Sequence, residues 1–350
     1  MKKIRIGIIG TGGIAMGRHI RELLACEDAE IVALCDIDPR RLAKACEKTG
    51  VAHEKCYSDY RKLIKDPDVD AVEICTPNYL HAEMAIESLR EGKPTNLEKP
   101  IAMSYEEAQT IVAAERESRS LGMTCFTYRF MPAVRYAKHL VDTDVIGDLI
   151  GLNVAYLKDS AFWEGRRLEW RFEKSKAASG VVGDLAVHLI DLAQLLAGQI
   201  KEVCASRGIV VKERKRFDSD EIAPVETEDR CSFIAHFENG AEGSFHITRC
   251  AIGHKNTIRY DVYGTKGSIS FDLNDPKILT ICSGEGDPKD YKTRTETVPQ
   301  EFYLTQEQAF VRAVQGTRDL LYPTLSDGAD GQRVVDAILR SADEKRWVEI

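Results

Sequence analysis

Side chains that could transfer protons lie along one predicted helix near the middle of the chain. Asp184, His188 and Asp191 are spaced i, i+4 and i+7, so they share one face of that helix. The residues between them are mostly apolar and are expected to face a core, which makes a polar row costly unless its members are paired or used. Three interpretations follow: a core histidine satisfied by carboxylates, a divalent-metal site, or a proton-transfer site. The sequence nearby offers no second histidine or cysteine ligand, so it disfavours the metal site.

A second candidate for proton transfer is Lys99, in the run Glu98-Lys99-Pro100. The proline pushes the backbone of Lys99 out of the helical region, so the preceding strand ends sharply there. A lysine in such a turn is ordinarily a solvated surface residue. Held beside a cofactor and partly desolvated, it is instead a usable acid–base group.

A glycine-rich turn near the N-terminus is typical of dinucleotide binding. Residues 7–15 read GIIGTGGIA and stand between a β-branched apolar run and a helical stripe. Gly10 permits the tight turn, Gly12 lets the backbone approach a pyrophosphate, and Ala15 fills the third small position of the fingerprint. A plain glycine turn between strand and helix is the alternative, and the following elements distinguish the two.

An acidic residue ends the second predicted strand, residues 30–38, as the fingerprint requires. Asp36 lies 21 positions beyond Ala15, where a carboxylate can accept hydrogen bonds from the adenosine ribose. The same carboxylate repels a 2′-phosphate, so the sequence favours NAD over NADP. Arg40 and Arg41 are close enough in sequence to leave NADP open as a second cofactor.

The elements that must position these residues alternate between strand and helix through the first third of the chain. Helices are predicted over residues 81–92 and 104–119, and further strands over 69–78, 94–104 and 123–132. In open α/β sheets, ligands bind at the carboxyl ends of the strands. The polar residues expected at those ends are Gly10–Gly13, Asp36, Thr76–Asn78, Glu98–Lys99 and Tyr128–Arg129.

The second half of the chain predicts a different, antiparallel sheet. Residues 231–250 form two strand patterns around Asn239-Gly240, which is a strong hairpin signal. Residues 258–273 repeat the pattern around the turn at 264–267. We therefore expect a dinucleotide-binding domain over residues 1–126 and a substrate-binding and oligomerisation domain over 127–350.

Composition narrows the function classes. A chain of 350 residues favours two domains, and 43% hydrophobic with 30% charged residues is typical of a globular protein. The net charge of −8 argues against a nucleic-acid partner, and the basic run Lys212–Arg216 is typical of a solvated loop or strand end. The chain holds no run of 18 uninterrupted apolar residues, so no transmembrane helix and no membrane partner are expected.

The ten cysteines are scattered and include no C-x-x-C pair, so no metal or thioredoxin-type site is predicted. The N-terminus resembles a strand and carries no secretory signal. We expect reduced cysteines that pack as small apolar residues, in a protein of the cytoplasm.

Several motifs, taken in order, resemble one family. They are GIIGTGGIA, CTPNYLH, NLEKP and YRFMP, followed by WRFEKSKAASGVVGDLAVHLIDLAQLL at residues 170–196. The chain resembles the glucose–fructose oxidoreductase, inositol dehydrogenase and rhizopine-catabolism (Gfo/Idh/MocA) family over essentially its whole length. It departs at GVVGD, where three consecutive glycines are frequent. The resemblance implies an α/β fold: an N-terminal Rossmann domain and a C-terminal α/β domain with a large, mostly antiparallel sheet, assembled as a homo-oligomer (dimer or tetramer).

The resemblance also implies the chemistry. His188 is the general base, Asp184 orients it or the substrate hydroxyl, and Lys99 assists, while Asp191 is structural. Hydride passes between the nicotinamide of NAD and a secondary alcohol of an inositol, monosaccharide or anhydrosugar. Two alternatives stay open: a sugar-active enzyme that recycles tightly bound NAD during glycosidic cleavage or elimination, and a non-catalytic nucleotide-binding regulator.

The remaining site residues are expected from the motifs and the resemblance together. The cofactor-binding set is Gly10, Gly12, Gly13, Ile14, Asp36, Thr76, Pro77, Asn78, His81, Glu98, Lys99 and Arg171. The substrate-binding set is Lys99, Tyr128, Tyr156, Trp163, Trp170, Asp184 and His188.

Overall fold

The computed structural model describes residues 3–350 and divides them into two compact units. The first comprises residues up to Thr127 together with Leu304–Asp330, and the second comprises Tyr128–Tyr303 with Gly331–Ile350. The first boundary falls one residue from the position expected from the sequence. Leu304–Asp330, however, returns to the first unit rather than staying with the second.

This return is driven by apolar burial. Thr305 and Gln308 form a reciprocal capping box that starts α9 (Gln306–Val314). Phe310 and Val311 on α9 are fully buried in the core of the first unit, as is Leu325 at the start of α10 (Leu325–Glu344). The division between the units falls inside α10. Local sequence patterns indicate these helices but not the distant core against which they pack.

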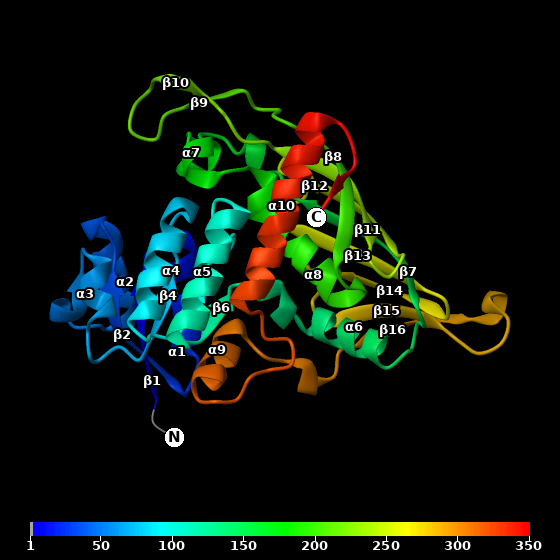
Figure 1. Cartoon of the computed structure of the whole chain (residues 1–350), viewed down its shortest axis with the longest axis horizontal. Coiled ribbons are helices and arrows are strands. Elements are labelled where there is room, and N and C mark those ends of the chain that lie inside the picture. Colours follow the sequence, from blue (N-terminus) through cyan, green and yellow to red (C-terminus); the bar gives the residue numbers. More distant parts are fainter. Residues whose placement is uncertain (1–2) are drawn as a thin grey trace. The chain divides into compact units, whose positions relative to one another are not determined.

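The first unit is built on a six-stranded parallel sheet (Figure 1). Its strand order is β3-β2-β1-β4-β5-β6, which is the doubly wound Rossmann order expected from the sequence. The order reverses between β1 and β4, so their carboxyl ends mark the edge at which ligands bind in such sheets. The strands are β1 (Ile4–Ile9), β2 (Ala29–Cys35), β3 (Cys56–Tyr57), β4 (Ala71–Ile74), β5 (Thr95–Leu97) and β6 (Gly122–Thr124).

Helices cover this sheet, and α4 and α5 lie side by side against it (Figure 1). Ser104 caps α5 as predicted, because its hydroxyl accepts the backbone N–H of Glu107 at 3.2 Å. The helix after the glycine turn begins as a π-helix, η1 (Ala15–His19), before it continues as α1. The others are α1 (Ile20–Leu24), α2 (Pro39–Thr49), η2 (His53–Lys55), α3 (Tyr60–Ile64), η3 (Asn78–Leu80), α4 (His81–Arg90) and α5 (Tyr105–Ser118).

The strand predicted over residues 123–132 is much shorter in the structure. After β6 the chain turns into a 3₁₀ helix, η4 (Thr127–Phe130). Tyr128 and Arg129 therefore lie on η4, beyond the end of β6, and belong to the second unit, so the predicted length of the strand was wrong. The turn forms because the backbone N–H of Phe126 already bonds back to the carbonyl of Thr124 at 2.7 Å.

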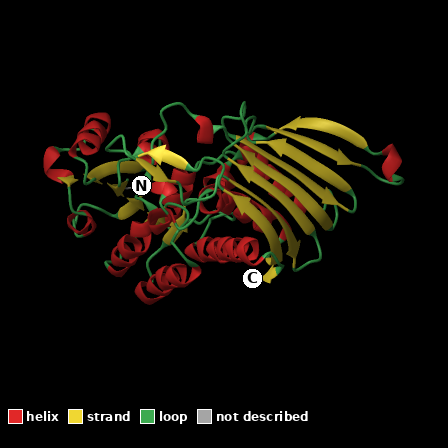
Figure 2. Cartoon of the chain, turned by 90° about the horizontal axis from the view of Figure 1, so that it is seen from above, coloured by secondary structure: helices red, strands yellow, loops and turns green. Residues whose placement is uncertain are grey.

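The second unit contains a nine-stranded sheet, seen broadside in Figure 2. Its order is β16-β15-β14-β13-β7-β12-β11-β8-β17, and it is antiparallel except where β12 pairs with β7. Both predicted hairpins, β11–β12 and β13–β14, are confirmed. The strands are β7 (Leu149–Leu157), β8 (Ile200–Gly208), β11 (Arg230–Phe237), β12 (Glu242–Thr248), β13 (Thr257–Gly264), β14 (Gly267–Asp272), β15 (Ile278–Ser283), β16 (Lys292–Thr297) and β17 (Val348–Glu349).

One face of this sheet is covered and the other is exposed. Along β11, Cys231, Phe233 and Ala235 are buried, whereas Ser232 and Ile234 are exposed. Contacts join α6 (Pro132–Asp142) to β15 and α8 (Val187–Ala197) to β7 on the covered face. The remaining elements are β9 (Glu213–Lys215), β10 (Ile222–Pro224), α7 (Lys174–Ala177), η5 (Ser160–Phe162), η6 (Trp170–Phe172), η7 (Val182–Ala186), η8 (Pro288–Asp290) and η9 (Gln300–Phe302).

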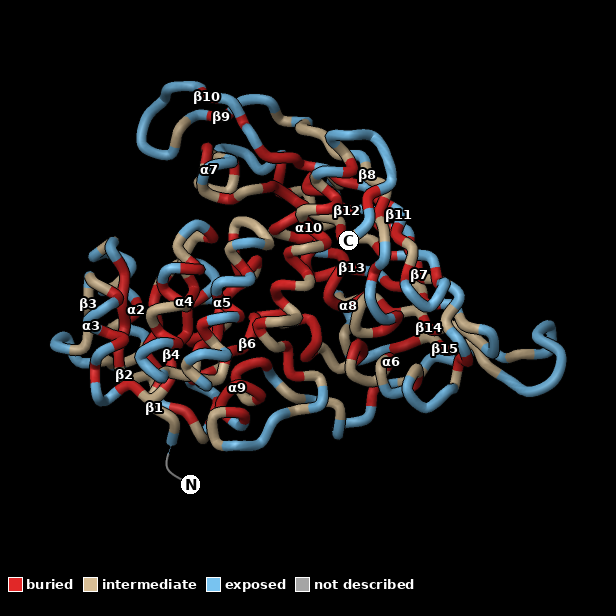
Figure 3. Tube along the Cα trace, viewed as in Figure 1, coloured by how far each residue is buried: buried red, intermediate tan, exposed pale blue. Residues whose placement is uncertain are grey.

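The helical stretch Lys174–Ala197 is long and apolar enough to cross a membrane by length and composition alone. Its most apolar window is 83% buried inside the protein, and Figure 3 marks such buried segments in red. That burial is the pattern of a core helix, and α8 within it is buried at nine of its eleven positions.

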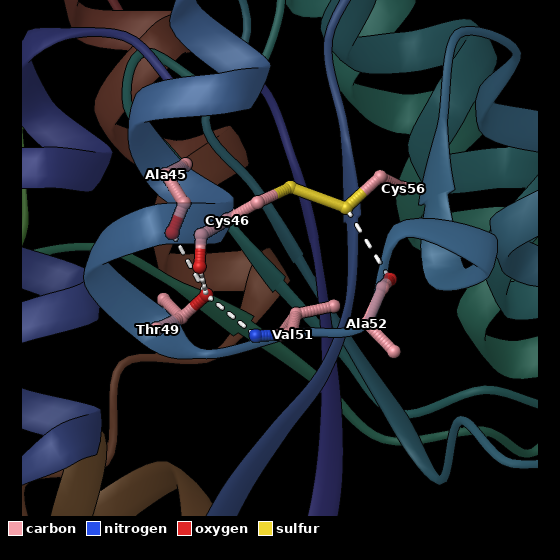
Figure 4. The surroundings of a disulfide bond; sticks show 6 residues. All are labelled: Ala45, Cys46, Thr49, Val51, Ala52 and Cys56. Carbon is pink, nitrogen blue, oxygen red and sulfur yellow. Dashed lines mark hydrogen bonds between the residues drawn. A yellow bond between two sulfur atoms is a disulfide. The ribbon is translucent and has the colours of Figure 1, made fainter.

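The expectation that all ten cysteines are reduced is wrong for one pair. Cys46, in the last turn of α2, forms a disulfide with Cys56 at the start of β3 (Figure 4). Gly50 ends α2 in the left-handed conformation, with φ of 74°, and the chain then turns back toward the helix. Thr49 holds this turn, because its hydroxyl donates to the carbonyl of Ala45 at 2.8 Å. This turn brings together two cysteines whose spacing in the sequence did not predict a disulfide.

Candidate active site

The glycine turn after β1 has the shape that a dinucleotide needs. Gly10 adopts φ of +88°, and a Cβ there would lie 2.7 Å from the carbonyl oxygen of Cys75, so a side chain is excluded. A Cβ added at Gly12 or Gly13 would meet nothing within 4 Å. The turn is therefore tight on the side of the sheet and open on the other, where Ile14 is also exposed. These residues fit a bound pyrophosphate.

Asp36 is fixed at the same edge, directly after β2. One carboxylate oxygen accepts the backbone N–H and the hydroxyl of Thr11, at 2.8 and 3.0 Å. The other accepts the backbone N–H of Asp38 at 2.9 Å. Arg40 and Arg41 form their ion pairs with Asp38. The carboxylate is thus held beside the glycine turn without a cation of its own, which suits a ribose diol better than a 2′-phosphate.

His81 holds two loops together. Its ring is fully buried, with Nδ1 2.8 Å from the carbonyl oxygen of Pro100 and Nε2 2.8 Å from that of Thr76. Burial lowers the pKa of the imidazole. Both nitrogens face backbone carbonyls, so the ring supports these loops, and cofactor contact at His81 stays a prediction. The loops it joins carry Pro77, Asn78 and Lys99.

Both carboxylate oxygens of Glu98 also contact groups of the protein. One of its oxygens lies 2.9 Å from Nε2 of His19, and the other accepts the backbone N–H of Lys99 at 3.1 Å. Glu98 is 8% exposed, whereas Lys99 itself is partly exposed and precedes a cis bond to Pro100. The glutamate expected to bind cofactor therefore shapes the backbone at Lys99.

In the second unit, a cluster of polar rings surrounds His188 on α8. The edge of the Tyr128 ring packs on the imidazole, with centroids 4.6 Å apart and planes at 67°. The hydroxyls of Tyr128 and Tyr156 lie 2.9 Å apart, and that of Tyr156 donates to Oδ1 of Asn256 at 2.9 Å. His188 is 6% exposed. The structure thus groups three of the predicted substrate residues, and it adds Asn256, which the sequence analysis did not select.

Asp184 has a cationic partner that the sequence analysis missed. Nη2 of Arg249, which follows β12, donates to a carboxylate oxygen of Asp184 at 2.7 Å. Arg249 is 2% exposed, while the Asp184 side chain is 29% exposed. Asp184 lies on the π-helix η7 and His188 on α8, so the predicted straight i, i+4 face contains a π-turn. Arg249 lies 65 residues beyond Asp184 in sequence, where no local pattern links the two.

Asp191 forms a buried ion pair within the second unit. Nε of Arg129 lies 2.9 Å from both carboxylate oxygens of Asp191, and the two side chains are 8% and 2% exposed. The pair ties η4 to α8. Both charges are satisfied in the interior, in accord with the structural role expected for Asp191.

Trp163 and Trp170 make contacts of their own within the second unit. Trp163 is 54% exposed and donates its indole N–H to Asp159 at 2.8 Å. It lines a cavity of about 340 Å³ whose other residues are Glu164, Gly165, Arg166, Arg167, Glu169 and Phe217. Arg171 stacks over the Trp170 ring at 4.3 Å and pairs with Glu169. A role of Trp163 and Trp170 in substrate binding stays a prediction.

The sequence analysis also missed a buried cluster of titratable side chains in the first unit. His19 is buried among Glu73, Glu98 and Glu307, which come from three different elements. A glutamate in the middle of the apolar strand β4, and a histidine in the apolar stripe after the glycine turn, were the available signals.

Comparisons with known proteins agree with this geometry. Residues 4–125 match the oxidoreductase family with an NAD-binding Rossmann fold (GFO_IDH_MocA), and residues 134–270 match the GFO/IDH/MocA C-terminal domain. Levoglucosan dehydrogenase of Pseudarthrobacter phenanthrenivorans is 30% identical over 100% of this chain and 99% of its own length. Myo-inositol 2-dehydrogenase of Thermotoga maritima is 27% identical over 99% of this chain and 98% of its own.

A solved structure is similar throughout. Levoglucosan dehydrogenase in complex with NADH and L-sorbose superposes with a TM-score of 0.90 at 30% identity, covering 100% of this chain and 99% of that one. The likeness extends over the residues of both units. The chain therefore belongs to the Gfo/Idh/MocA family of oxidoreductases.

Proposed function

We propose that this protein is an NAD-dependent dehydrogenase acting on a secondary alcohol of a cyclitol or sugar, such as an inositol, a monosaccharide or an anhydrosugar. The observation that carries the proposal is the enclosed cluster of Tyr128, Tyr156 and His188, attached to a dinucleotide-binding fold. Hydroxyl and imidazole groups are suited to binding polyols and to moving a hydroxyl proton. Relatives named for levoglucosan and myo-inositol support this substrate class.

The first unit would hold the cofactor. Gly10, Gly12 and Gly13 present backbone to the pyrophosphate, and Asp36 accepts hydrogen bonds from the adenosine ribose. Bound NAD supplies a hydride acceptor at nicotinamide C4. Thr76, Pro77 and Asn78, at the switch point of the sheet, belong to the same cofactor surface in this proposal.

Proton handling is assigned to residues of this chain. His188 accepts the proton of the substrate hydroxyl, and the Asp184 carboxylate orients His188 or that hydroxyl, while Arg249 holds the carboxylate in place. Lys99 assists the same proton transfer. Tyr128 and Tyr156 position further substrate hydroxyls. Trp170 is a further proposed contact of the substrate, and Arg171, which stacks on its ring, is a proposed contact of the cofactor.

The test is the formation of NADH, followed at 340 nm, with a panel of inositols, monosaccharides and anhydrosugars. We expect a substrate-dependent rise with NAD, abolished by Lys99→Ala and retained by the matched control Lys62→Ala, whose side chain is exposed on α3. Consumption of a glycoside without net NADH would favour the enzyme with internally recycled NAD. NAD binding without conversion of any substrate would favour a regulator.

We further propose that the protein is a homo-oligomer joined through the exposed face of the nine-stranded sheet. That face carries Ile234 and Tyr263, 49% and 44% exposed, on strands three positions apart in the sheet order. Light scattering after gel filtration should give a dimer or tetramer, and Ile234→Lys should shift it toward the monomer. A wild-type monomer would contradict this proposal.

A further inference from the structure

The first unit encloses a charged cluster that the dehydrogenase chemistry above does not use. Nδ1 of His19 lies 3.0 Å from an oxygen of Glu73 and 2.8 Å from an oxygen of Glu307. Nε2 of His19 lies 2.9 Å from Glu98. The side chains of His19, Glu73 and Glu307 are fully buried, and that of Glu98 is 10% exposed.

The contacts define the protonation state of the ring. Each ring nitrogen faces a carboxylate oxygen, and carboxylate oxygens accept hydrogen bonds, so both nitrogens must donate. His19 is then an imidazolium between two carboxylates, since Nδ1 faces Glu307 and Nε2 faces Glu98. Burial opposes that charge, but Cys75 and Glu307 raise the pKa of His19 well above its ordinary value.

Two side-chain amides of the same unit donate hydrogen bonds to the cluster. Asn96 on β5 donates to Glu73 at 2.8 Å, and Gln306 donates to Glu307 at 3.0 Å. Burial, with the neighbouring Glu307, raises the pKa of Glu73 to about 8, so one carboxyl of the cluster keeps its proton at neutral pH. The titratable groups that couple to His19 across its surroundings are Glu22, Glu73, Cys75, Glu98, Cys125 and Glu307.

This cluster is connected to the proposed reaction through one residue. The Glu98 oxygen that does not face His19 accepts the backbone N–H of Lys99. We propose that His19, as a doubly protonated imidazolium, is a positioning residue: it fixes the Glu98 carboxylate, and through it the backbone from which the Lys99 side chain extends. His19 also ends η1, directly after the glycine turn, and Glu307 lies on α9, so the same ring joins the cofactor turn to the returning segment. The inference rests on the proposed role of Lys99.

The first experiment reads the ring itself and needs no activity. Long-range ¹H–¹⁵N spectra of the full chain, with labelled histidine, should show both nitrogens of His19 protonated from pH 6 to 8. Solvent-exposed His53 serves as the internal comparison, and His19→Gln assigns the signal. One unprotonated nitrogen at pH 7 would overturn the proposal, whatever the protein's activity.

The second experiment measures catalysis. His19→Gln and Glu98→Gln should each lower kcat roughly 10²-fold, the effect of a small displacement of a reacting group, and leave KM for NAD within about threefold. The pH profile of kcat should change in both variants. Leu89→Ala, a fully buried change on α4, is the matched destabilised control and should keep kcat. A His19→Gln variant with wild-type kcat and pH profile would overturn the proposal.

A metal analysis completes the test. His19, Glu73 and Cys125 place one ligand atom each within 4.8 Å of one another, so the same cluster has the composition of a small metal site. Stoichiometric zinc in the purified protein would overturn the proposal, because a metal-bound nitrogen carries no proton. Metal-free protein with the doubly protonated ring would support it. If the wild type forms no NADH while the ring is doubly protonated, it is the proposed function that fails.

Discussion

The Asp184–Arg249 pair predicts an asymmetry between two substitutions. Arg249 is almost fully buried and its Nη1 lacks a hydrogen-bond partner, whereas the Asp184 side chain retains about a third of its exposure. Asp184→Asn therefore leaves a guanidinium buried without its counter-ion. Arg249→Met leaves a carboxylate that water can still solvate, and the methionine keeps packing near Phe172.

The magnitudes follow from this difference in burial. Removing one partner of a buried pair costs about 3–5 kcal/mol. Removing the cation beside a partly solvated carboxylate costs roughly 1–2 kcal/mol. For a unit of this size each kcal/mol lowers Tm by about 2–4 °C, so Asp184→Asn should lower Tm by roughly 6–20 °C and Arg249→Met by roughly 2–8 °C.

The assay is thermal unfolding followed by calorimetry or circular dichroism, with NADH formation measured on the same preparations. Both variants should lose activity, because the carboxylate that orients His188 is either neutral or unanchored. Equal losses of Tm, or a larger loss for Arg249→Met, would refute the reasoning from burial. An Arg249→Met variant with wild-type kcat would refute the assigned role of the pair.

Three further predictions follow from other contacts. Asp36→Ser should raise the ratio of kcat/KM for NADP to that for NAD by about tenfold, since the carboxylate that repels a 2′-phosphate is removed; initial rates with both cofactors measure this. Glu73 has a folded pKa of about 8, above its unfolded value, so its contribution to stability is complete at low pH and is lost as pH rises toward 8. Urea unfolding from pH 5 to 8 should therefore show a wild-type decline that is steeper than that of Glu73→Gln by about 1 kcal/mol per pH unit. Asp191→Asn should unfold at least 6 °C earlier, from the roughly 3 kcal/mol cost of breaking a buried ion pair, while the variant that replaces both Arg129 and Asp191 by leucine recovers part of that loss.

The sequence predicted the features that are encoded locally. The alternation of strand and helix, the glycine turn with Asp36, the Ser104 cap and both hairpins depend on residues close together in the chain. Each was visible as a spacing or a turn signal. His188 could also be selected from the local sequence, because a row of polar residues on an otherwise apolar helix is costly to bury unless its members are paired or used.

What could not be predicted depends on contacts between distant segments. Arg249 pairs with Asp184 across 65 residues, and Glu307 reaches His19 from a segment that returns to the first unit after the second is complete. His81 and Glu98 were placed near the cofactor, yet their polar atoms are taken by Thr76, His19 and neighbouring backbone. A motif gives the identity of such residues, but only the fold shows which of their atoms remain free.

The most direct test of the central claim is to follow the hydride itself. The protein is incubated with NAD and a sugar or inositol that carries deuterium on the carbinol carbon, and the nicotinamide is then examined by NMR. The account predicts deuterium at nicotinamide C4, transferred to a single face of the ring, and none with Lys99→Ala. Loss of the substrate's deuterium to solvent, with unlabelled nicotinamide throughout, would contradict it.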